Sequence, residues 1–229
     1  MISSRFLAKL FICVLSFTNV ILCAREESRR TFEIVLTPAE IDPIGAGPRQ
    51  VILVNGSFPG PTLRLTVGEE IDFIVRNHLR EDTSVHFHGI GQRHTPWADG
   101  TPGISQAPIR PGASYLYKWK AEESGVYFYH AHNHGQLMDG LYGAIIINAE
   151  PEAERPFHLI SDNAEDQVAM RAADESVEPL MISDWTQFTF NEFYEIEQKA
   201  NLDFTCMDAI IVNGAVCFQV TLCGKRRVY

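Results

Sequence analysis

The sequence predicts an all-β protein whose first two-thirds form a Greek-key β-sandwich. Three observations support this fold class. Seven short runs rich in Val, Ile, Tyr and Phe lie between about residues 31 and 149. Turn-forming segments such as "GSFPGPT", "RPGA" and "EESG" separate several of these runs. The chain of 229 residues is 45% hydrophobic and 10% aromatic, which is enough for a sizeable core.

The expected strands follow one another along the chain, and each is rich in the β-branched and aromatic residues that fit a pleated, half-buried surface. In order they are "TFEIVL", "RQVILVNG", "LRLTVGEEIDFIVRNHL", "SVHFHGI", "SYLYKWKA", "GVYFYHAH" and "LYGAIIINA".

The texture of the sequence changes after "NAEPEAERP". We expect strands in "FHLISD", "LMISDWTQF" and "MDAIIVNG", and a helix in "NEFYEIEQKAN". Two or three strands cannot bury a sandwich core by themselves. The sequence therefore predicts a second unit that is incomplete.

Residues 1–24 have the pattern of a secretory signal peptide. Arg5 and Lys9 are basic, and the apolar segment "LFICVLSFTNVILCA" that follows is too short to span a bilayer comfortably. Cleavage after Ala24 would give a secreted protein without membrane contact, since no later stretch is long and apolar enough to cross a membrane. A short anchor helix that stays uncut is the alternative.

Charge and cysteine content exclude several classes of function. The net charge of −10 repels phosphate backbones and anionic lipids, which argues against nucleic-acid binding and leaves cationic partners and neutral small molecules. Beyond the expected signal peptide the cysteines are Cys206, Cys217 and Cys223, and no C-x-x-C occurs. Zinc-finger and thioredoxin-like sites are therefore poor interpretations.

Four histidines form two pairs with the spacing of strand residues that share a face. His86 and His88 lie in "SVHFHGI", and His130 and His132 lie in "GVYFYHAH". Neighbouring strands can bring four neutral imidazoles to one edge of a sheet. Such a set suits copper, zinc, nickel or iron, and copper(II) has the highest place in the affinity order. The alternative is four polar residues on an exposed strand face.

The segments "HFHGIGQRHTPWADGTPGISQAPIRPG" and "GVYFYHAHNHGQLMDGLYGAIII" resemble the first cupredoxin domain of the multicopper oxidases, the family of laccases and ascorbate oxidases. The fungal type is the most similar, and "VNGSFPGPTLRLTVGEEI" resembles the segment that precedes the first copper motif there. The resemblance implies a first plastocyanin-like (cupredoxin) domain over residues 31–150. A partial second cupredoxin-like domain would cover residues 155–229.

The resemblance also implies roles for individual residues. His86 would bind the type 2 copper, and His88, His130 and His132 the two type 3 coppers. Asp99, in "WADG", would be a carboxylate near the cluster that supplies protons for the reduction of O2, although Asp-Gly is also a common turn pair. The implied reaction removes single electrons from a phenol or a similar small donor and reduces O2 to water.

The sequence departs from the family pattern in its ligand count. Family members bind the three-copper cluster with eight histidines, and a type 1 copper with an H-C-H motif, whereas no "HCH" occurs here. We therefore expect this chain to be the front part of an oxidase that does not turn over alone. Two other functions stay open, which are a copper-binding module without turnover and a β-sandwich that binds no metal.

Overall fold

The structure, a computed structural model, describes residues 29–200 and 207–219, so the expected signal peptide lies outside the described residues. Its elements in chain order are β1 (Arg29–Ile41), β2 (Arg49–Val54), β3 (Gly60–Thr66), β4 (Glu70–Asn77), β5 (Val85–His88), η1 (Pro96–Ala98), β6 (Ser114–Lys120), β7 (Gly125–Ala131), β8 (Tyr142–Asn148), η2 (Pro156–Leu159), α2 (Ala164–Glu175), β9 (Ile182–Trp185), α3 (Phe190–Ala200), β10 (Ala209–Val212) and β11 (Ala215–Gln219).

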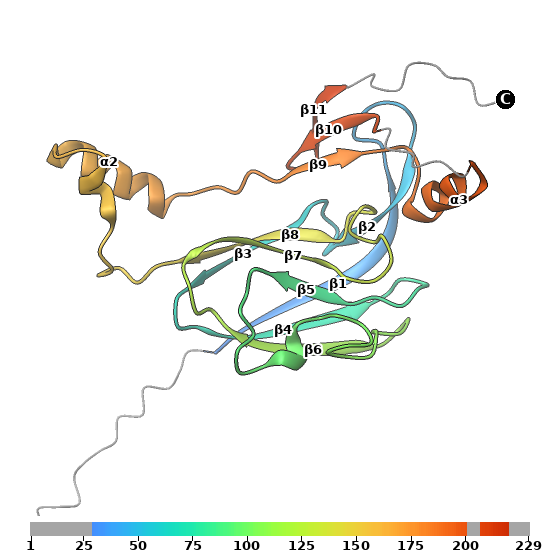
Figure 1. The fold of residues 1–229 in the computed structure, drawn as a ribbon. Helices are drawn as coiled ribbons and strands as arrows, with labels where there is room; N and C mark the ends of the chain where they lie inside the picture. Colours follow the sequence, from blue (N-terminus) through green and yellow to red (C-terminus); the bar gives the residue numbers. More distant parts are fainter. Residues whose placement is uncertain (1–28, 201–206, 220–229) are drawn as a thin grey trace, which may run out of the picture.

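The first eight strands form two stacked sheets, which confirms the predicted all-β sandwich (Figure 1). One sheet has the strand order β2-β1-β4-β6 and the other β3-β8-β7-β5. The seven runs give eight strands because "LRLTVGEEIDFIVRNHL" contains a turn. Gly68 adopts φ +92° in this turn and divides the run between β3 and β4.

The core of the sandwich lies between the inner faces of these two sheets. On β5, Val85 and Phe87 are fully buried, and the alternation of the strand turns His86 and His88 outward. The ring of Phe87 packs edge-on against Phe73 at 5.1 Å and Tyr117 at 5.4 Å between centroids. Burial of each such side chain stabilises the fold by roughly 1.5–3 kcal/mol. The core therefore fixes the strand that carries the first histidine pair.

A third sheet, with the order β11-β10-β9, covers part of the sandwich. It buries Trp185, Ala209 and Ile211 against Ile44 and Val51. The strands expected in "LMISDWTQF" and "MDAIIVNG" and the helix expected in "NEFYEIEQKAN" are confirmed as β9, β10 and α3.

Two features of residues 150–180 differ from the expectation. The segment "FHLISD" is not a strand, because Pro156 begins the short 3-10 helix η2 there. The helix α2 was not expected. Its signal lies in its cap, where the side chain of Asn163 accepts a hydrogen bond from the N–H of Glu165 at 2.8 Å. None of the residues of α2, all of which are described, is buried, so the helix shows no core-facing stripe.

Within residues 29–200 and 207–219, the helices are too short or too polar to cross a bilayer.

Candidate metal centre

The two histidine pairs meet at the edge of the sheet β3-β8-β7-β5. β5 is the edge strand, and it pairs antiparallel with β7 so that His86 lies directly opposite His130. His88 lies opposite Phe128 in the same register. The predicted alternation therefore places both histidines of β5 on the outer face, beside their partners from β7.

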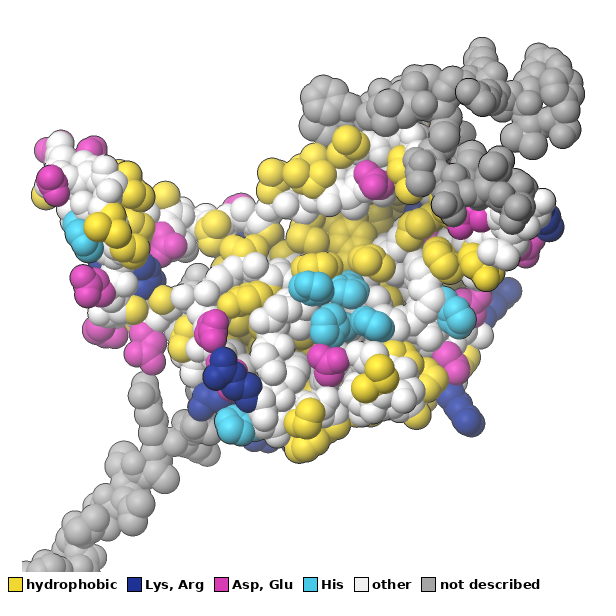
Figure 2. Space-filling model, in the orientation of Figure 1, with side chains coloured by type: hydrophobic (Ala, Val, Ile, Leu, Met, Phe, Trp, Pro, Cys, Tyr) yellow, Lys and Arg dark blue, Asp and Glu magenta, His cyan; other side chains and the backbone are white. Residues whose placement is uncertain are grey.

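All four predicted histidines are brought together. The ring centroid of His86 lies 5.5 Å from His88, 5.3 Å from His130 and 5.5 Å from His132. One ligand nitrogen from each of His86, His88 and His130 lies within 4.8 Å of the others. Figure 2 shows histidine side chains gathered in the middle of one face of the molecule. The cluster is accessible, since His88 and His132 are exposed.

His132 reaches the cluster from outside the strand. β7 ends at Ala131, one residue earlier than the spacing predicts. The N–H of His132 donates to the carbonyl oxygen of Ser84 at 3.2 Å, which ties it to the residue before β5. This bond continues the register in which Val85 lies opposite Ala131, so His132 keeps the alternation that also turns His130 outward.

Hydrogen bonds select the ring nitrogens that face outward. The Nδ1 atom of His86 donates to the backbone carbonyl of Asp99 at 2.6 Å, and the Nδ1 atom of His130 donates to the carbonyl of Ala131 at 2.8 Å. In a neutral imidazole the other nitrogen, Nε2, then carries the lone pair. Both rings are thus held in the tautomer that can bind a metal through Nε2.

Burial keeps His130 neutral. Only 8% of the residue is exposed, and this burial lowers the pKa of its imidazole, an effect that His86, His88 and His132 reinforce. A metal must otherwise displace a proton from a charged imidazole. His130 is therefore in the ligand form at neutral pH.

Asp99 lies in a turn and beside His86. It ends the short helix η1, and Gly100 follows with φ +81°. A Cβ on Gly100 would lie 1.8 Å from the carbonyl oxygen of Val85, so only glycine permits this close approach to β5. The turn brings the Asp99 carbonyl to His86. The Asp99 carboxylate lies 3.4 Å from the same Nδ1 atom and accepts a hydrogen bond from the Thr101 hydroxyl at 2.7 Å.

Phe128 also belongs to the site, although the histidine spacing does not indicate it. Its ring stacks on His88 at 4.9 Å and on His130 at 4.8 Å, each with an interplanar angle of 24°. The available signal was its position two residues before His130 on the same strand, because residues at that spacing share a face. Phe128 restricts the orientation of both imidazoles.

The donor set fits copper. The closely spaced group of His86, His88 and His130 consists of imidazoles alone, and His132 adds a fourth beside it. Imidazole suits copper, zinc, nickel and iron, and it disfavours calcium and magnesium. His134, two residues after His132, is exposed and has φ +40°. Among the described residues, it does not belong to the closely spaced group of ligand atoms.

Known proteins resemble this chain over most of its length. It is 64% identical over 184 residues to the multicopper oxidase elcG of Phaeosphaeria nodorum, which covers 80% of this chain and 30% of that protein. It is 45% identical over 166 residues to the laccase abr2 of Aspergillus fumigatus, which covers 72% of this chain and 28% of that protein. The chain thus spans about 30% of the length of these relatives.

Solved structures agree with these relatives. A crystal structure of the laccase from Botrytis aclada matches with a TM-score of 0.62 and 26% identity, over 82% of this chain and 31% of that one. Fet3p, a multicopper oxidase that functions in iron import, matches with a TM-score of 0.66 and 25% identity, over 82% and 33%. These likenesses confirm the predicted cupredoxin-like fold class.

The multicopper oxidase family model matches residues 36–152, which is half of the chain and includes all four clustered histidines. Copper is the metal that this family implies, and the imidazole cluster is compatible with it. This chain therefore belongs to the multicopper oxidase family of copper-dependent oxidoreductases.

Proposed function

We propose that His86, His88, His130 and His132 bind copper, and that they form this chain's share of the centre at which a secreted oxidase reduces O2 to water. The electron donor would be a phenol or a similar small molecule. The observation that carries the proposal is the convergence of four imidazoles, two of them with Nδ1 engaged by backbone carbonyls and Nε2 available.

Each residue has a definite part in this proposal. His86 is the ligand of the type 2 copper, and His88, His130 and His132 are ligands of the type 3 pair. Bound copper supplies the ability to accept single electrons and deliver them to O2. The protein orients the imidazoles through the Asp99 carbonyl and the stacked ring of Phe128.

The Asp99 carboxylate is proposed to hold a proton near the cluster. Reduction of O2 to water consumes protons, and a carboxylate can deliver them through water. Its Oδ1 atom lies 3.4 Å from His86 Nδ1, and the side chain is 39% exposed, so it contacts both the cluster and solvent. Asp99→Asn would keep the backbone contact to His86 while it removes the acid.

Three further points belong to the same proposal. Residues 1–24 are a signal peptide that is removed on export. Residues 31–150 are a first cupredoxin domain, an assignment that the two-sheet sandwich supports. Residues 155–229 belong to a second cupredoxin-like domain, which the sheet β11-β10-β9 supports.

A copper-binding module without turnover is the second candidate for the 229 residues taken by themselves. The chain spans about 30% of its relatives, and the family resemblance assigns it four of the eight histidines expected around the cluster. We therefore expect these residues alone to bind copper and to show no oxygen uptake with a phenol. Uptake well above a copper-only control, abolished by His88→Ala, would contradict this expectation.

Copper titration of the full chain tests the site. The double variant His86→Ala/His130→Ala should lose most of its affinity for copper(II), measured by competition with a coloured chelator. His94→Ala/His158→Ala is the matched control, since both residues are exposed and lie outside the cluster. Equal affinity of the two double variants would exclude the proposed ligands.

A further inference from the structure

Two loops lead to the histidine pairs, and they meet at one buried side chain. Residues 78–84 precede β5, and residues 132–141 connect β7 to β8. Gln136 lies between them and is only 4% exposed. Its Oε1 atom accepts a hydrogen bond from the Thr83 hydroxyl at 2.7 Å, and its Nε2 atom donates to the Asp82 carbonyl at 2.9 Å. One amide therefore joins the two loops through both of its polar ends.

The contact between Gln136 and Thr83 lies close to the proposed metal ligands along the chain. Thr83 precedes His86 by three residues, and Gln136 follows His132 by four. The backbone N–H of Gln136 donates to the carbonyl of His134 at 2.9 Å, so its backbone belongs to the turn that follows His132. A displacement of Gln136 would thus be transmitted directly to His132.

The loop before β5 is a rigid support. The fully buried Asn77 donates to the carbonyls of Glu81 and Ile109, at 2.8 Å each. The backbone of Thr83 pairs with Ile109 through hydrogen bonds of 3.0 and 2.7 Å. The sandwich core thereby fixes Thr83, and Gln136 is attached to it.

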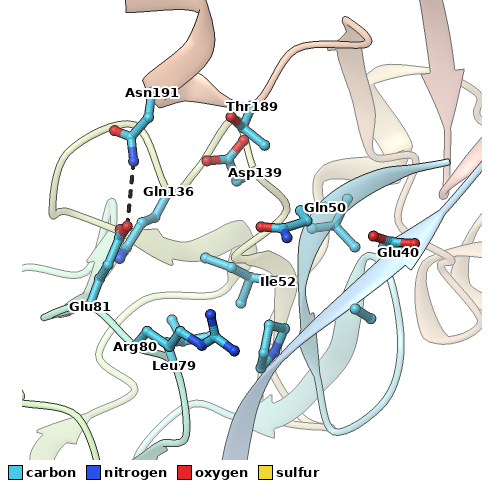
Figure 3. Close-up of a pocket in the computed structure, with 13 residues that line it drawn as sticks. Glu40, Gln50, Ile52, Leu79, Arg80, Glu81, Gln136, Asp139, Thr189 and Asn191 are labelled. Carbon is cyan, nitrogen blue, oxygen red and sulfur yellow. Dashed lines mark hydrogen bonds between the residues drawn. The ribbon is translucent and has the colours of Figure 1, made fainter.

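The loop after β7 borders a cleft on its other side. A cleft of about 360 Å³ opens there, lined by residues that include Gln136, Glu81 and Asp139 (Figure 3). His132 itself lies beyond the end of β7, and its N–H bond to Ser84 is 3.2 Å long. Arg49 and the N–H of Ile52 hold the far end of the loop at Met138 and Asp139, so the contacts to residues 82–84 are those that hold the end nearest His132.

We propose that Gln136 is a positioning residue for the copper centre: through Thr83 and Asp82 it holds the loop of His132 against the strand of His86. Loss of the Thr83–Gln136 contact leaves a buried hydroxyl or amide without a partner, which favours separation of the loops. This inference rests on the proposed copper site. It adds that the loop beginning at His132 is held against the strand of His86 by a buried amide that would touch neither copper nor a ligand ring.

The test uses the full chain and near-isosteric changes. Thr83→Val and Gln136→Met each remove the shared hydrogen bond and keep the volume. Thr83→Ser keeps the hydroxyl and is the conservative rescue. Ile34→Val, in the core on β1, is a destabilised control far from the loops. Copper(II) affinity should fall about tenfold in the first two variants and stay unchanged in the last two.

A measurement without metal separates this inference from the copper proposal. The rings of His86 and His132 lie 5.5 Å apart between centroids, so their ring protons should give a nuclear Overhauser effect in the metal-free chain. The effect should weaken in Thr83→Val and Gln136→Met and persist in Thr83→Ser and Ile34→Val. If all four variants keep it and bind copper equally, Gln136 is not a positioning residue. If the unmodified chain binds no copper while the effect still depends on Gln136, the copper proposal fails and the positioning role stands.

Discussion

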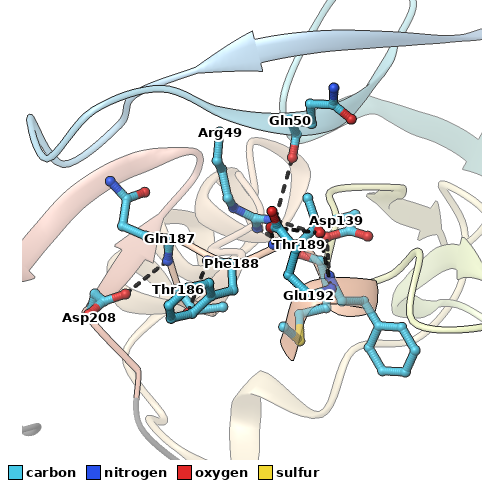
Figure 4. A network of polar contacts seen from close by, with 11 residues as sticks. Arg49, Gln50, Asp139, Thr186, Gln187, Phe188, Thr189, Glu192 and Asp208 are labelled. Carbon is cyan, nitrogen blue, oxygen red and sulfur yellow. Dashed lines mark hydrogen bonds and ion pairs between the residues drawn. The ribbon is translucent and has the colours of Figure 1, made fainter. Parts of the chain in front are cut away.

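Arg49→Met should destabilise the contact between the sandwich and the third sheet. The Nη1 atom of Arg49 lies 2.8 Å from Asp139 Oδ1, and its Nη2 atom donates to the Met138 carbonyl at 2.9 Å (Figure 4). The guanidinium also lies 4.1 Å from the ring centroid of Trp185. Methionine keeps an aliphatic contact with that ring but leaves the Asp139 carboxylate without its cation.

The size of the expected loss of stability follows from the burial of this ion pair. The side chains of Arg49 and Asp139 are 4% and 17% exposed, and breaking a buried pair by removing one partner costs about 3–5 kcal/mol. A loss of about 3 kcal/mol corresponds to a fall in Tm of roughly 6–12 °C for a chain of 150–250 residues. Arg76→Met is the control, because its ion pair with Glu33 has the same 2.8 Å distance while both side chains stay more than 40% exposed.

Urea unfolding followed by tryptophan fluorescence gives the free energy of unfolding of each variant. Arg49→Met should be several-fold more destabilised than Arg76→Met. Asp139→Asn added to Arg49→Met should restore part of the loss, because a neutral amide needs no cation. Equal effects of the two arginine variants would show that burial does not set the strength of this pair.

Three other predictions follow from the same contacts. Burial raises the pKa of Asp139 and Arg49 opposes this, so without Arg49 the folded carboxyl takes up its proton at higher pH. The loss of stability in Arg49→Met should therefore shrink as the pH falls from 7 toward the unfolded pKa of about 3.9. Urea unfolding from pH 7 to 4 checks the sign, and a loss that grows as the pH falls would contradict it. Gly100→Ala should lower the free energy of unfolding by about 2–3 kcal/mol and weaken copper binding, because its Cβ would meet the Val85 carbonyl. Gly112 has a similar φ and open space around it, so Gly112→Ala should lower the free energy of unfolding less and leave copper affinity unchanged. Copper affinity should decline in acid, because protons compete with copper for the imidazole nitrogens, and a pH-independent isotherm would argue against histidine ligands.

Alternation along strands was enough to predict how the four histidines are grouped. His86 and His88 share a face because the apolar Val85 and Phe87 must enter the core. The same rule places His130 outward. His132 lies one residue beyond the end of β7 and keeps the same register because its N–H binds the Ser84 carbonyl, a tertiary contact that the sequence does not show.

Other features were beyond local reasoning for similar reasons. The hydrogen bond between Gln136 and Thr83 connects residues 53 positions apart, so spacing in the sequence cannot indicate it. The contact of His86 is with a backbone carbonyl of Asp99, and every residue type offers that atom. The helix α2 has no buried face, which removes the apolar period on which a helix prediction depends.

The central claim is that these four imidazoles bind copper, His86 and His130 through Nε2. The most direct measurement is an anomalous difference map, recorded at the copper absorption edge, from crystals of the copper-loaded chain. The account predicts peaks within bonding distance of the Nε2 atoms of His86 and His130 and of a ring nitrogen of His88 and of His132. Copper bound elsewhere, or bound to Nδ1 of His86 with loss of its bond to the Asp99 carbonyl, would contradict it.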